Sequence, residues 1–524
     1  MTQVFIDTSS ATRRDDLTFL EGEGVASESL AHGRMSARNE LTLDLRGGAD
    51  SMRDAGPKWL SMEQGEKLPE YRRRLGRTHL LGAYDDCIEK LVAKPFSREI
   101  TLVGEDTLSD MLMRTVEDPD LEGGSVTTFF REGFDTGIDR GLHHVLVEFP
   151  TVGETLNAAT EKSLGVHPYF VHVDPEQLIG ARYVRTSAGK KELAEIRIKS
   201  VVTEPLDNFG EQEVQVIRVI RAPIAAVVDD DDAETTPGEP GTWEVWRLDP
   251  ANKEWAIHEG PHTHTYPGIP LATVYYDKRD ELEARPPLWR LAELNLEHWQ
   301  KKSDQDNLLH VARVPILFRS GWSSAELKKP LVVGGNRSLG STQKDADMRF
   351  VEHSGKALGA GQADLDKIEE QMERCGLDPL IRRASSSLAT NIMVGDAKET
   401  NMLQAWAGVT ERFIVECFRI AGQWVNEDLS EEFDADIFDE FGLSARATEN
   451  LAALDKARAR GDISQETYLN ELKRYAALSP SVDTDEEIER TADEGPALGT
   501  ITEDDLPEDD LPEEPEEPEE DETL

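Results

Sequence analysis

The stretch PPLWRLAELNLEHWQKKSDQDNLLHVARVPILF, residues 286–318, organises the rest of the chain. Its two opening prolines suit a first helical turn, where no amide hydrogen bond is lost, and Pro315 closes the pattern. Apolar side chains recur at helical spacing near both ends: Leu288, Leu291, Ala292, Trp299, Leu308, Val311 and Ala312. A helix of about 28 residues is about 42 Å long. With a polar middle, KKSDQDN, the pattern predicts a strut between two bodies; an ordinary amphipathic helix with a solvated central face is the alternative.

The chain is strongly acidic. Its 524 residues include 104 acidic and 57 basic side chains, for a formal net charge of −47. Sixteen Asp or Glu and no Lys or Arg follow Arg490, which leaves −31 for the rest. Affinity for phosphate needs Lys and Arg that displace counterions, so this composition is poor for gripping nucleic acid.

Cysteine usage and hydropathy bear on the compartment. Cys87, Cys375 and Cys417 are scattered, with no CxxC or similar spacing, which indicates reduced, buried thiols. The opening MTQVFIDTSSATRRDD has no apolar signal core, and no apolar run reaches the roughly 20 residues of a membrane helix. We therefore expect a soluble protein made inside a cell.

The first half of the chain predicts an arm followed by mixed α/β structure. Residues 1–56 show no sustained period and are expected to be mobile or to order on a partner. Apolar spacing predicts helices over 71–94 and 127–140. Short strands are expected at 100–103, 143–150, 167–173, 196–202, 214–221, 243–248 and 255–258. Together they predict a mostly antiparallel sheet with helices on one side.

The second half predicts helices around a broken, Gly-rich segment. Residues 322–361 are expected to hold short strands at 331–333 and 348–352. Helices are predicted over 363–375 and 397–429, and a helical pair over 444–478. Gly461 ends the first member of that pair and Ser464 caps the second. The acidic, Pro-punctuated residues 481–524 are expected to be disordered.

Motifs for covalent or metal chemistry are weak. His258, His262 and His264 are irregularly spaced around a Pro/Gly turn with no Cys nearby, so a metal site is not expected. The segment GKALGAG, residues 355–361, lacks the order of a phosphate-binding loop, and neither a Walker-type loop nor a GxSxG elbow is present. We expect no catalytic residues, no metal, no cofactor and no enzymatic activity.

The helical pair near the C-terminus could be a DNA-reading helix-turn-helix or a packing hairpin. A groove-reading helix presents Arg, Lys, Asn or Gln near its start. This one begins Ser464-Gln465-Glu466, and basic residues appear only at Lys473 and Arg474. The pattern favours an αα-hairpin that packs on its neighbours.

Several motifs together resemble the portal proteins of tailed bacteriophages and prophages. IPLATVYYDKRD (269–280) leads into a long helix with an Asn…Ser-Asp signature, here Asn295 and Ser303-Asp304. The helix exits through Val314-Pro315 into a short strand ending at Phe318. Further similarity lies in the strand 145–150, the Pro168-Tyr169 strand and the turn 461–467, so the resemblance covers about 59–478.

The resemblance implies an α+β, portal-type fold that assembles as a ring, usually a dodecamer. Its parts are a mixed α/β wing, a two-helix stem, a small α/β clip and an all-helical crown. The resemblance implies these boundaries: mobile arm 1–56, wing 57–285 and 392–440, stem 286–313 and 361–381, clip 314–360, tunnel-loop region 382–391, crown 441–480 and disordered tail 481–524.

The resemblance also implies a role and partners. Such rings sit at one vertex of the capsid in the virion, assemble in the host cytoplasm, and pass double-stranded DNA during packaging and ejection. They contact the major capsid protein, the terminase large subunit, and adaptor or tail proteins. The stem would use Trp289, Leu291, Trp299, Leu308 and Val311; the clip would dock partners through Ile316, Phe318 and Trp322. The tunnel loop would include Arg382, Arg383, Ser385, Ser386 and Ser387.

An acidic chain suits a channel that guides DNA without holding it. A ring repeats each inward side chain around its axis, and salt limits the resulting field to about 10 Å at 0.1 M. Two other classes stay open: a head–tail adaptor or minor capsid protein, and a metal-dependent nucleic-acid enzyme with unfamiliar motifs.

Overall fold

The computed structural model of the chain separates into two compact units, Met1–Asp439 (unit 1) and Glu440–Leu524 (unit 2). The structure describes the following residues: 6–7, 24–150, 165–185, 189–206, 209–224, 227–228, 235–236, 238–249, 252–313, 316–328, 341, 343–351, 356–375, 389–439, 447–474, 477–478, 482 and 484–493. Among them, no helix combines the length and apolar character needed to cross a bilayer.

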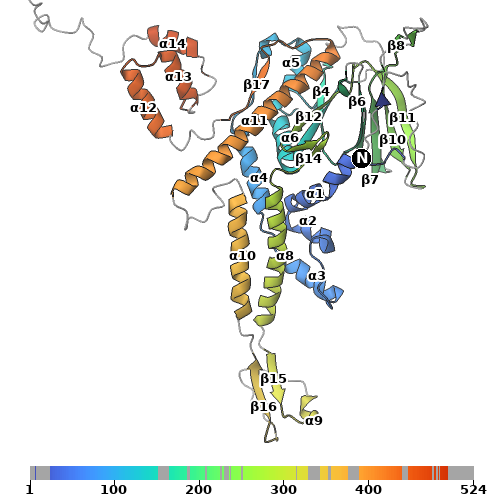
Figure 1. Ribbon diagram of the computed structural model, residues 1–524, viewed down its shortest axis with the longest axis vertical. Helices are drawn as coiled ribbons and strands as arrows, with labels where there is room; N and C mark the ends of the chain where they lie inside the picture. The colour runs from blue at the N-terminus through green and yellow to red at the C-terminus, as the bar shows by residue number, and fades with distance from the viewer. Residues whose placement is uncertain are drawn as a thin grey trace, which may run out of the picture. The chain divides into compact units, whose positions relative to one another are not determined.

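Helices contribute much of unit 1 (Figure 1). They are α1 (Leu30–Arg46), α2 (Gly48–Ala55), α3 (Leu68–Arg77), α4 (Ala83–Ala93), α5 (Asp110–Glu117), α6 (Val126–Arg140), α8 (Trp289–Ala312), α9 (Ser324–Leu327), α10 (Lys356–Cys375) and α11 (Ala389–Val425). Short 3-10 turns are η2 (Gly56–Lys58), η3 (Pro95–Ser97) and η4 (Glu105–Thr107).

The strands lie in unit 1. They are β1 (Ile6–Asp7), β2 (Thr101–Val103), β3 (Leu142–Glu148), β4 (Tyr169–Val173), β5 (Leu178–Arg185), β6 (Lys191–Leu206), β7 (Gly210–Arg221), β8 (Val227–Val228), β9 (Thr235–Thr236), β10 (Gly241–Leu248), β11 (Trp255–His264), β12 (Leu271–Tyr275), β13 (Lys278–Asp280), β14 (Glu283–Ala284), β15 (Ile316–Ser320), β16 (Asp347–Val351) and β17 (Asp434–Asp436). The chain is therefore mixed α/β, as the patterns predict.

The larger sheet has the order β1-β5-β6-β7-β10-β11. Its neighbours pair antiparallel except for the short β1, which runs parallel to β5. Alternating apolar residues give it a buried face that includes Ile196 and Ile198 of β6. The same apolar cluster holds Leu146 of β3 and Leu271 of β12, so this sheet packs against a second one.

The second sheet has three antiparallel strands in the order β12-β3-β4. The sequence predicts one sheet; the structure divides the strands because β12 returns to pair with β3 through Leu271↔Leu146. A core rich in phenylalanine joins this sheet to α6 and α11, with edge-to-face contacts between Phe130 and Phe413 and between Phe170 and Phe418.

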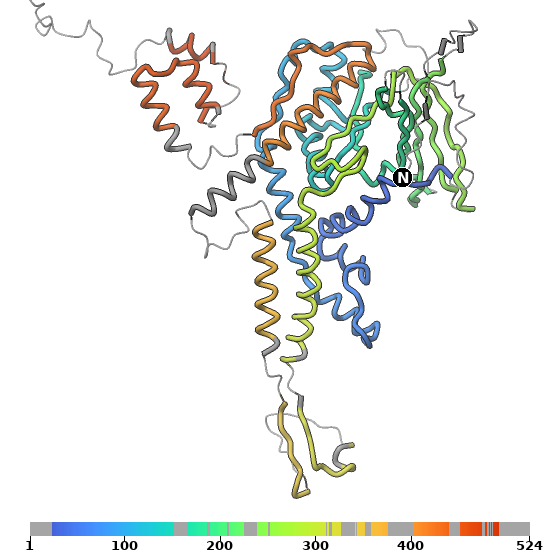
Figure 2. The backbone as a smooth tube through the Cα atoms, in the orientation of Figure 1, coloured from blue at the N-terminus to red at the C-terminus, as the bar shows by residue number. Residues whose placement is uncertain are grey.

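The helices α8 and α10 pack along each other, and the chain between them includes the strand pair β15–β16 (Figure 2). Helix α8 begins at Trp289, three residues after the expected start, because Pro286 and Leu288 form the preceding turn. Helix α10 begins at Lys356, inside the segment predicted to be broken and Gly-rich. The predicted strand at 331–333 lies outside the described residues.

The expectation of a mobile arm over 1–56 is wrong for its second half. Ser29 caps α1 by accepting the His32 amide at 3.2 Å, and Met35, Leu41 and Leu45 are buried. Two further inward positions of α1 are polar, Asn39 and Thr42, and both are buried. These polar residues interrupt the apolar stripe, which is why the sequence shows no helical period there.

Unit 2 is all helical in its described part. Helices α12 (Ala447–Ala459) and α13 (Gln465–Arg474) form the predicted pair, and Ser464 accepts the Thr467 amide at 3.1 Å. Helix α14 (Thr484–Asp493) packs on α13, and the Gln465 amide donates to the Thr491 hydroxyl at 2.7 Å. The expected disorder from residue 481 onward is therefore wrong for α14; the remainder, 494–524, lies outside the described residues.

Candidate assembly site

Helix α8 is anchored to α4 and the segment before it by the side chain of Asn295, which is fully buried. Its Oδ1 accepts the backbone N–H of Tyr84 at 3.0 Å, and its Nδ2 donates to the Leu81 carbonyl at 2.9 Å. These groups belong to the first turn of α4 and the segment before it, where helical amides and carbonyls need outside partners. Asn295 thus fixes the start of α4 against the middle of α8.

Ser303, two turns along α8, makes a second buried polar anchor. Its hydroxyl lies 3.0 Å from Thr78 Oγ1, and Arg74 donates to it at 3.3 Å. The Arg74 guanidinium is itself buried, and it also donates to the Glu66 carboxylate at 2.8 Å and to the Ser61 carbonyl at 2.7 Å. The hydrogen bond from Arg74 lowers the pKa of Glu66. The Asn…Ser signature therefore holds α8 against α3 and α4.

The opposite face of α8 carries a polar seam to α10. Lys301 Nζ lies 2.9 Å from Asp364 Oδ2, and His298 Nε2 lies 3.5 Å from Glu369 Oε1. Burial lowers the pKa of His298. Gln305 donates to the Leu358 carbonyl at 3.0 Å. Residue numbers rise along α8 as they fall along α10, so the two helices are antiparallel.

Apolar packing and one glycine complete the contact with α10. Leu365, Ile368 and Met372 form its buried stripe. A Cβ added to Gly361 would overlap the side-chain amide of Gln305, so glycine permits the close approach of the two helices. The segment GKALGAG is therefore largely the first turns of α10 rather than a loop.

The predicted stem residues differ in their placement. Leu291 and Trp299 are buried, and Trp289 is half-buried. Leu308, expected to continue the apolar stripe, is exposed because α8 turns Ser303 and Gln305 towards its neighbours there. Val311 lies in α8, and its side chain is outside the described part of the chain.

The strand pair β15–β16 presents apolar side chains to solvent. Its register pairs Ile316 with Val351 and Phe318 with Arg349. Phe318 is exposed, and the Arg349 guanidinium lies 5.6 Å from its ring centre. The indole N–H of Trp322 donates to the Asp347 carbonyl at 3.1 Å. Phe350 and Val351, which the sequence does not single out, are also exposed. Val351 shares a face with Phe318 and Phe350 lies on the other, so both faces of this pair offer apolar side chains.

Two other predicted sets bear on the site. The residues predicted for the tunnel loop, Arg382, Arg383, Ser385, Ser386 and Ser387, lie outside the described residues.

The three histidines 258, 262 and 264 lie on β11 rather than in a turn. His264 contacts the Arg221 carbonyl at 2.9 Å, and the ring centre of His262 lies 4.7 Å from that of Trp243. In the part of the chain that the structure describes, no His, Cys, Asp or Glu side chains group as metal ligands.

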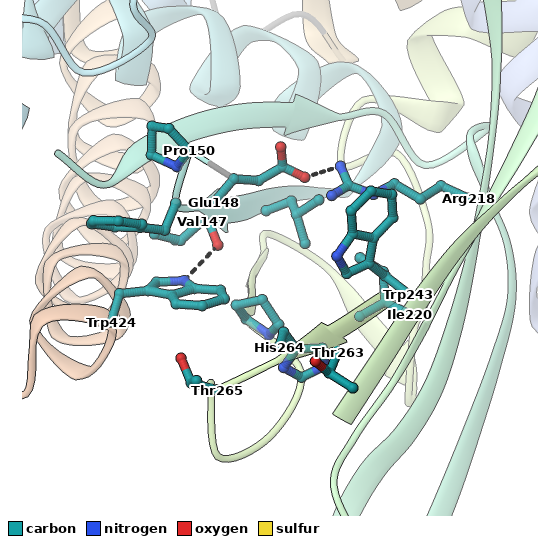
Figure 3. A pocket seen from close by; sticks show the side chains of 13 residues that line it. Val147, Glu148, Pro150, Arg218, Ile220, Trp243, Thr263, His264, Thr265 and Trp424 are labelled. Carbon is teal, nitrogen blue, oxygen red and sulfur yellow. Dashed lines mark hydrogen bonds and ion pairs between the residues drawn. The ribbon is translucent and has the colours of Figure 1, made fainter. Parts of the chain in front are cut away.

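A pocket of about 190 Å³ lies between the two sheets and the C-terminal end of α11 (Figure 3). Trp424 donates to the Val147 carbonyl at 2.9 Å, and Glu148 forms an ion pair with Arg218. Tyr169 also donates to Glu148, at 2.8 Å. Both charged groups of the pocket thus have protein partners, and the remaining walls are mainly aromatic and aliphatic.

Comparisons with known proteins give one family and several solved structures. Residues 287–425, from the start of α8 to the end of α11, match a family described as a domain of unknown function, DUF4055. No curated protein sequence matches the chain.

Three of the similar solved structures are of gene transfer agent (GTA) particles. A chain of the neck of an empty GTA particle, computed with C6 symmetry, is 10% identical, with 76% of this chain and 91% of that chain covered and a TM-score of 0.37. The neck of the native particle with C12 symmetry gives 11% identity, 74% and 89% coverage and a TM-score of 0.39. The native virion gives 9% identity, 76% and 90% coverage and 0.36.

Proposed function

We propose that this chain is the portal subunit of a tailed-phage-like particle. Copies form a ring, dodecameric in the arrangement we expect, at one vertex of the capsid, and double-stranded DNA passes through it during packaging and ejection. The role is structural, and no residue of the chain performs covalent chemistry. The ring is assembled in the host cytoplasm and remains in the virion.

The observation that carries this proposal is that α8 is held on both of its faces. Ser303 faces α3, whereas Lys301 and Gln305, two residues away on either side, face α10. At 3.6 residues per turn, a separation of two residues places side chains on roughly opposite sides of a helix. A helix that is hydrogen-bonded to neighbours on two opposite sides is a rigid strut. Helix α10 runs antiparallel beside it.

The strut leads into a surface suited to partner proteins. The β15–β16 pair at the far end of the two helices exposes Phe318 and Phe350. Exposed apolar groups of this kind mark interaction sites. We assign Ile316, Phe318 and Trp322 to docking of the terminase large subunit and later of adaptor or tail proteins. The α/β body of unit 1 is the wing that meets the major capsid protein, and unit 2 is the crown.

The net charge fits a channel that repels DNA at short range. A ring multiplies the inward charge of each subunit by the number of copies, and an acidic wall keeps a polyanion from adhering. Most of the channel wall is acidic in this proposal. The segment beside it differs, because it carries the basic Arg382 and Arg383 and the polar serines at 385–387.

The test uses particles produced in the host with and without this chain. A portal role predicts that particles lacking the chain contain no DNA, and that antibody-linked gold labels one vertex of normal particles. Labelling spread over the whole shell would favour a minor capsid protein. DNA-filled particles without the chain would contradict the proposal.

A further inference from the structure

Strands β6 and β7 extend beyond their neighbouring strands as a two-stranded arm, one face of which is covered at Val214. The neighbouring strand β5 pairs with β6 only as far as Ile198, and β10 pairs with β7 only from Val216 onward. The pairs from Val201↔Gln215 to Leu206↔Gly210 therefore have no further strand on either side in the described residues. We call residues 201–206 and 209–215 the arm. A two-stranded ribbon alone in water is marginally stable, so it needs support from another surface.

The arm exposes apolar side chains along its length. Phe209, beside the turn, is 100% exposed, and Val201 is 57% exposed. Val202 and Leu206 are also exposed, but they lie on the opposite face of the two strands from Val201, Glu211 and Glu213, because side chains alternate along a strand. Apolar side chains gathered on a projecting element mark a contact surface.

The charge of the arm is purely acidic. Glu204, Glu211 and Glu213 lie on it, and residues 200–216 contain no Lys or Arg. Glu204 is paired with Arg247 at 2.6 Å, whereas Glu211 and Glu213 are exposed. A surface that covers the arm should therefore combine apolar and basic side chains.

Helix α3 offers such a surface on the same chain. The inward side of α3 already packs within the subunit: Tyr71 and Arg74 are buried, and Arg74 donates hydrogen bonds to Glu66 and Ser303. Its outward side carries Leu68, Arg72 and Arg73, all exposed. Leu68 and Arg72 are one turn apart and share a face. We call Leu68, Arg72 and Arg73 the α3 surface.

We propose that the arm of one copy packs on the α3 surface of the next copy. Apolar residues of the arm cover Leu68, while Glu211 and Glu213 face Arg72 and Arg73. Because the two patches are different and lie on one chain, the contact is heterologous and repeats from copy to copy around a ring. This inference rests on the proposed ring and names a contact that closes it.

The test exchanges charges across the contact in the full-length chain. One variant carries Arg72→Glu with Arg73→Glu, a second carries Glu211→Arg with Glu213→Arg, and a third combines all four. Arg131→Glu on α6, another exposed arginine, is the matched control. Ring assembly is measured by mass photometry over a dilution series, and circular dichroism checks that each variant is folded.

We expect each double variant to raise the concentration for half-assembly at least about fivefold at low salt, given the usual strength of exposed ion pairs. The fourfold variant should return towards wild type, and the control should match wild type. Rings unaffected by either double variant, or no recovery in the fourfold variant, would overturn the arm contact while the ring itself stands. A loss restricted to the α3 variant and reproduced by deleting residues 494–524 would assign the α3 surface to the acidic tail instead. Absence of rings in the wild-type chain would overturn the proposed function.

Discussion

The side-chain oxygen of Asn295 accepts the backbone N–H of Tyr84 at 3.0 Å, across 211 residues of sequence. The same side chain donates to the Leu81 carbonyl, so a single amide group satisfies both a donor and an acceptor at the start of α4. The position of α8 relative to α4 therefore depends on buried hydrogen bonds as well as on apolar packing. Such bonds are directional, and their loss leaves buried polar groups without partners.

Replacing Asn295 by Ala should lower the free energy of unfolding by about 1–3 kcal/mol, because the Tyr84 amide and Leu81 carbonyl are left unsatisfied. Urea denaturation followed by circular dichroism measures this change. Asn307→Ala on the same helix is the control: Asn307 accepts a hydrogen bond from the exposed Arg77 side chain, at 3.4 Å. Equal effects of the two substitutions would show that the anchor contributes nothing specific.

Replacing Leu308 by Pro should block ring assembly. Leu308 is exposed in α8, so little packing is lost, but proline removes an amide and clashes with the preceding turn at a cost of about 3 kcal/mol or more. Leu308→Ala keeps the helix and should assemble normally. Mass photometry separates rings from monomers, and normal rings from the proline variant would contradict the role of α8 as a strut.

The stability of unit 1 should fall as the pH falls below about 6.5. Burial lowers the pKa of His144 to about 3 and that of His172 to about 4, and it lowers the pKa of His143 well below its usual value. These groups stay neutral in the folded state while the unfolded chain binds protons. Each contributes up to about 1.4 kcal/mol of lost stability per pH unit.

Asp139 acts in the opposite direction. Burial raises its pKa to about 6, so the folded state binds its proton first as the pH falls towards 4 and the penalty of the buried charge is relieved. Burial also raises the pKa of Asp85, Glu411 and Asp436, and we expect the three histidines to outweigh these carboxyl groups and Asp139 together. His144→Asn should therefore make the fall in unfolding free energy between pH 6.5 and 4.5 shallower, whereas His258→Asn on the exposed part of β11 should not. A slope unchanged by His144→Asn would refute the assignment.

Truncation after Asp493 should leave unit 2 intact, whereas truncation after Pro480 should loosen it. The shorter chain lacks α14 and its hydrogen bond from Gln465 to Thr491. Hydrogen exchange should then become faster in α13, by roughly the fivefold or more that corresponds to 1 kcal/mol. Equal protection of α13 in both truncations would mean that α14 gives no support to the unit.

Replacing Arg382 and Arg383 together by Ala tests two readings of these residues. A contact with passing phosphates predicts intact rings with altered retention of DNA, an effect that shrinks as salt rises. A pairing with acidic groups of an adjacent subunit predicts weaker rings. Particles carrying the double variant are assayed for DNA content at low salt; normal content and normal rings would refute both.

Periodic elements of the fold were predictable, whereas their partners were not. The α11 stripe, with Phe413 and Cys417 buried, follows one regular helical period. Helix α1 breaks that period with the buried Asn39 and Thr42, so sequence alone suggests a mobile segment. Asn295 and Ser303 can be picked out from the sequence as a motif. Their role depends on Tyr84 and Thr78, more than two hundred residues away.

The arm formed by β6 and β7 was also not predictable from the sequence. Phe209 lies between an asparagine and a glycine, a composition that reads as a turn. Its full exposure depends on where β5 and β10 stop pairing, and no local pattern encodes that point. Likewise, the sequence gives no reason to distinguish among three consecutive arginines, Arg72, Arg73 and Arg74. In the fold Arg74 is buried, whereas the other two are exposed.

Electron microscopy of the purified full-length chain tests the central claim most directly. Negative-stain class averages of the assembled protein should show closed rings with a central hole and rotational symmetry about the ring axis. Monomers, twofold dimers or open filaments at every concentration would contradict the assignment of this chain as a portal subunit.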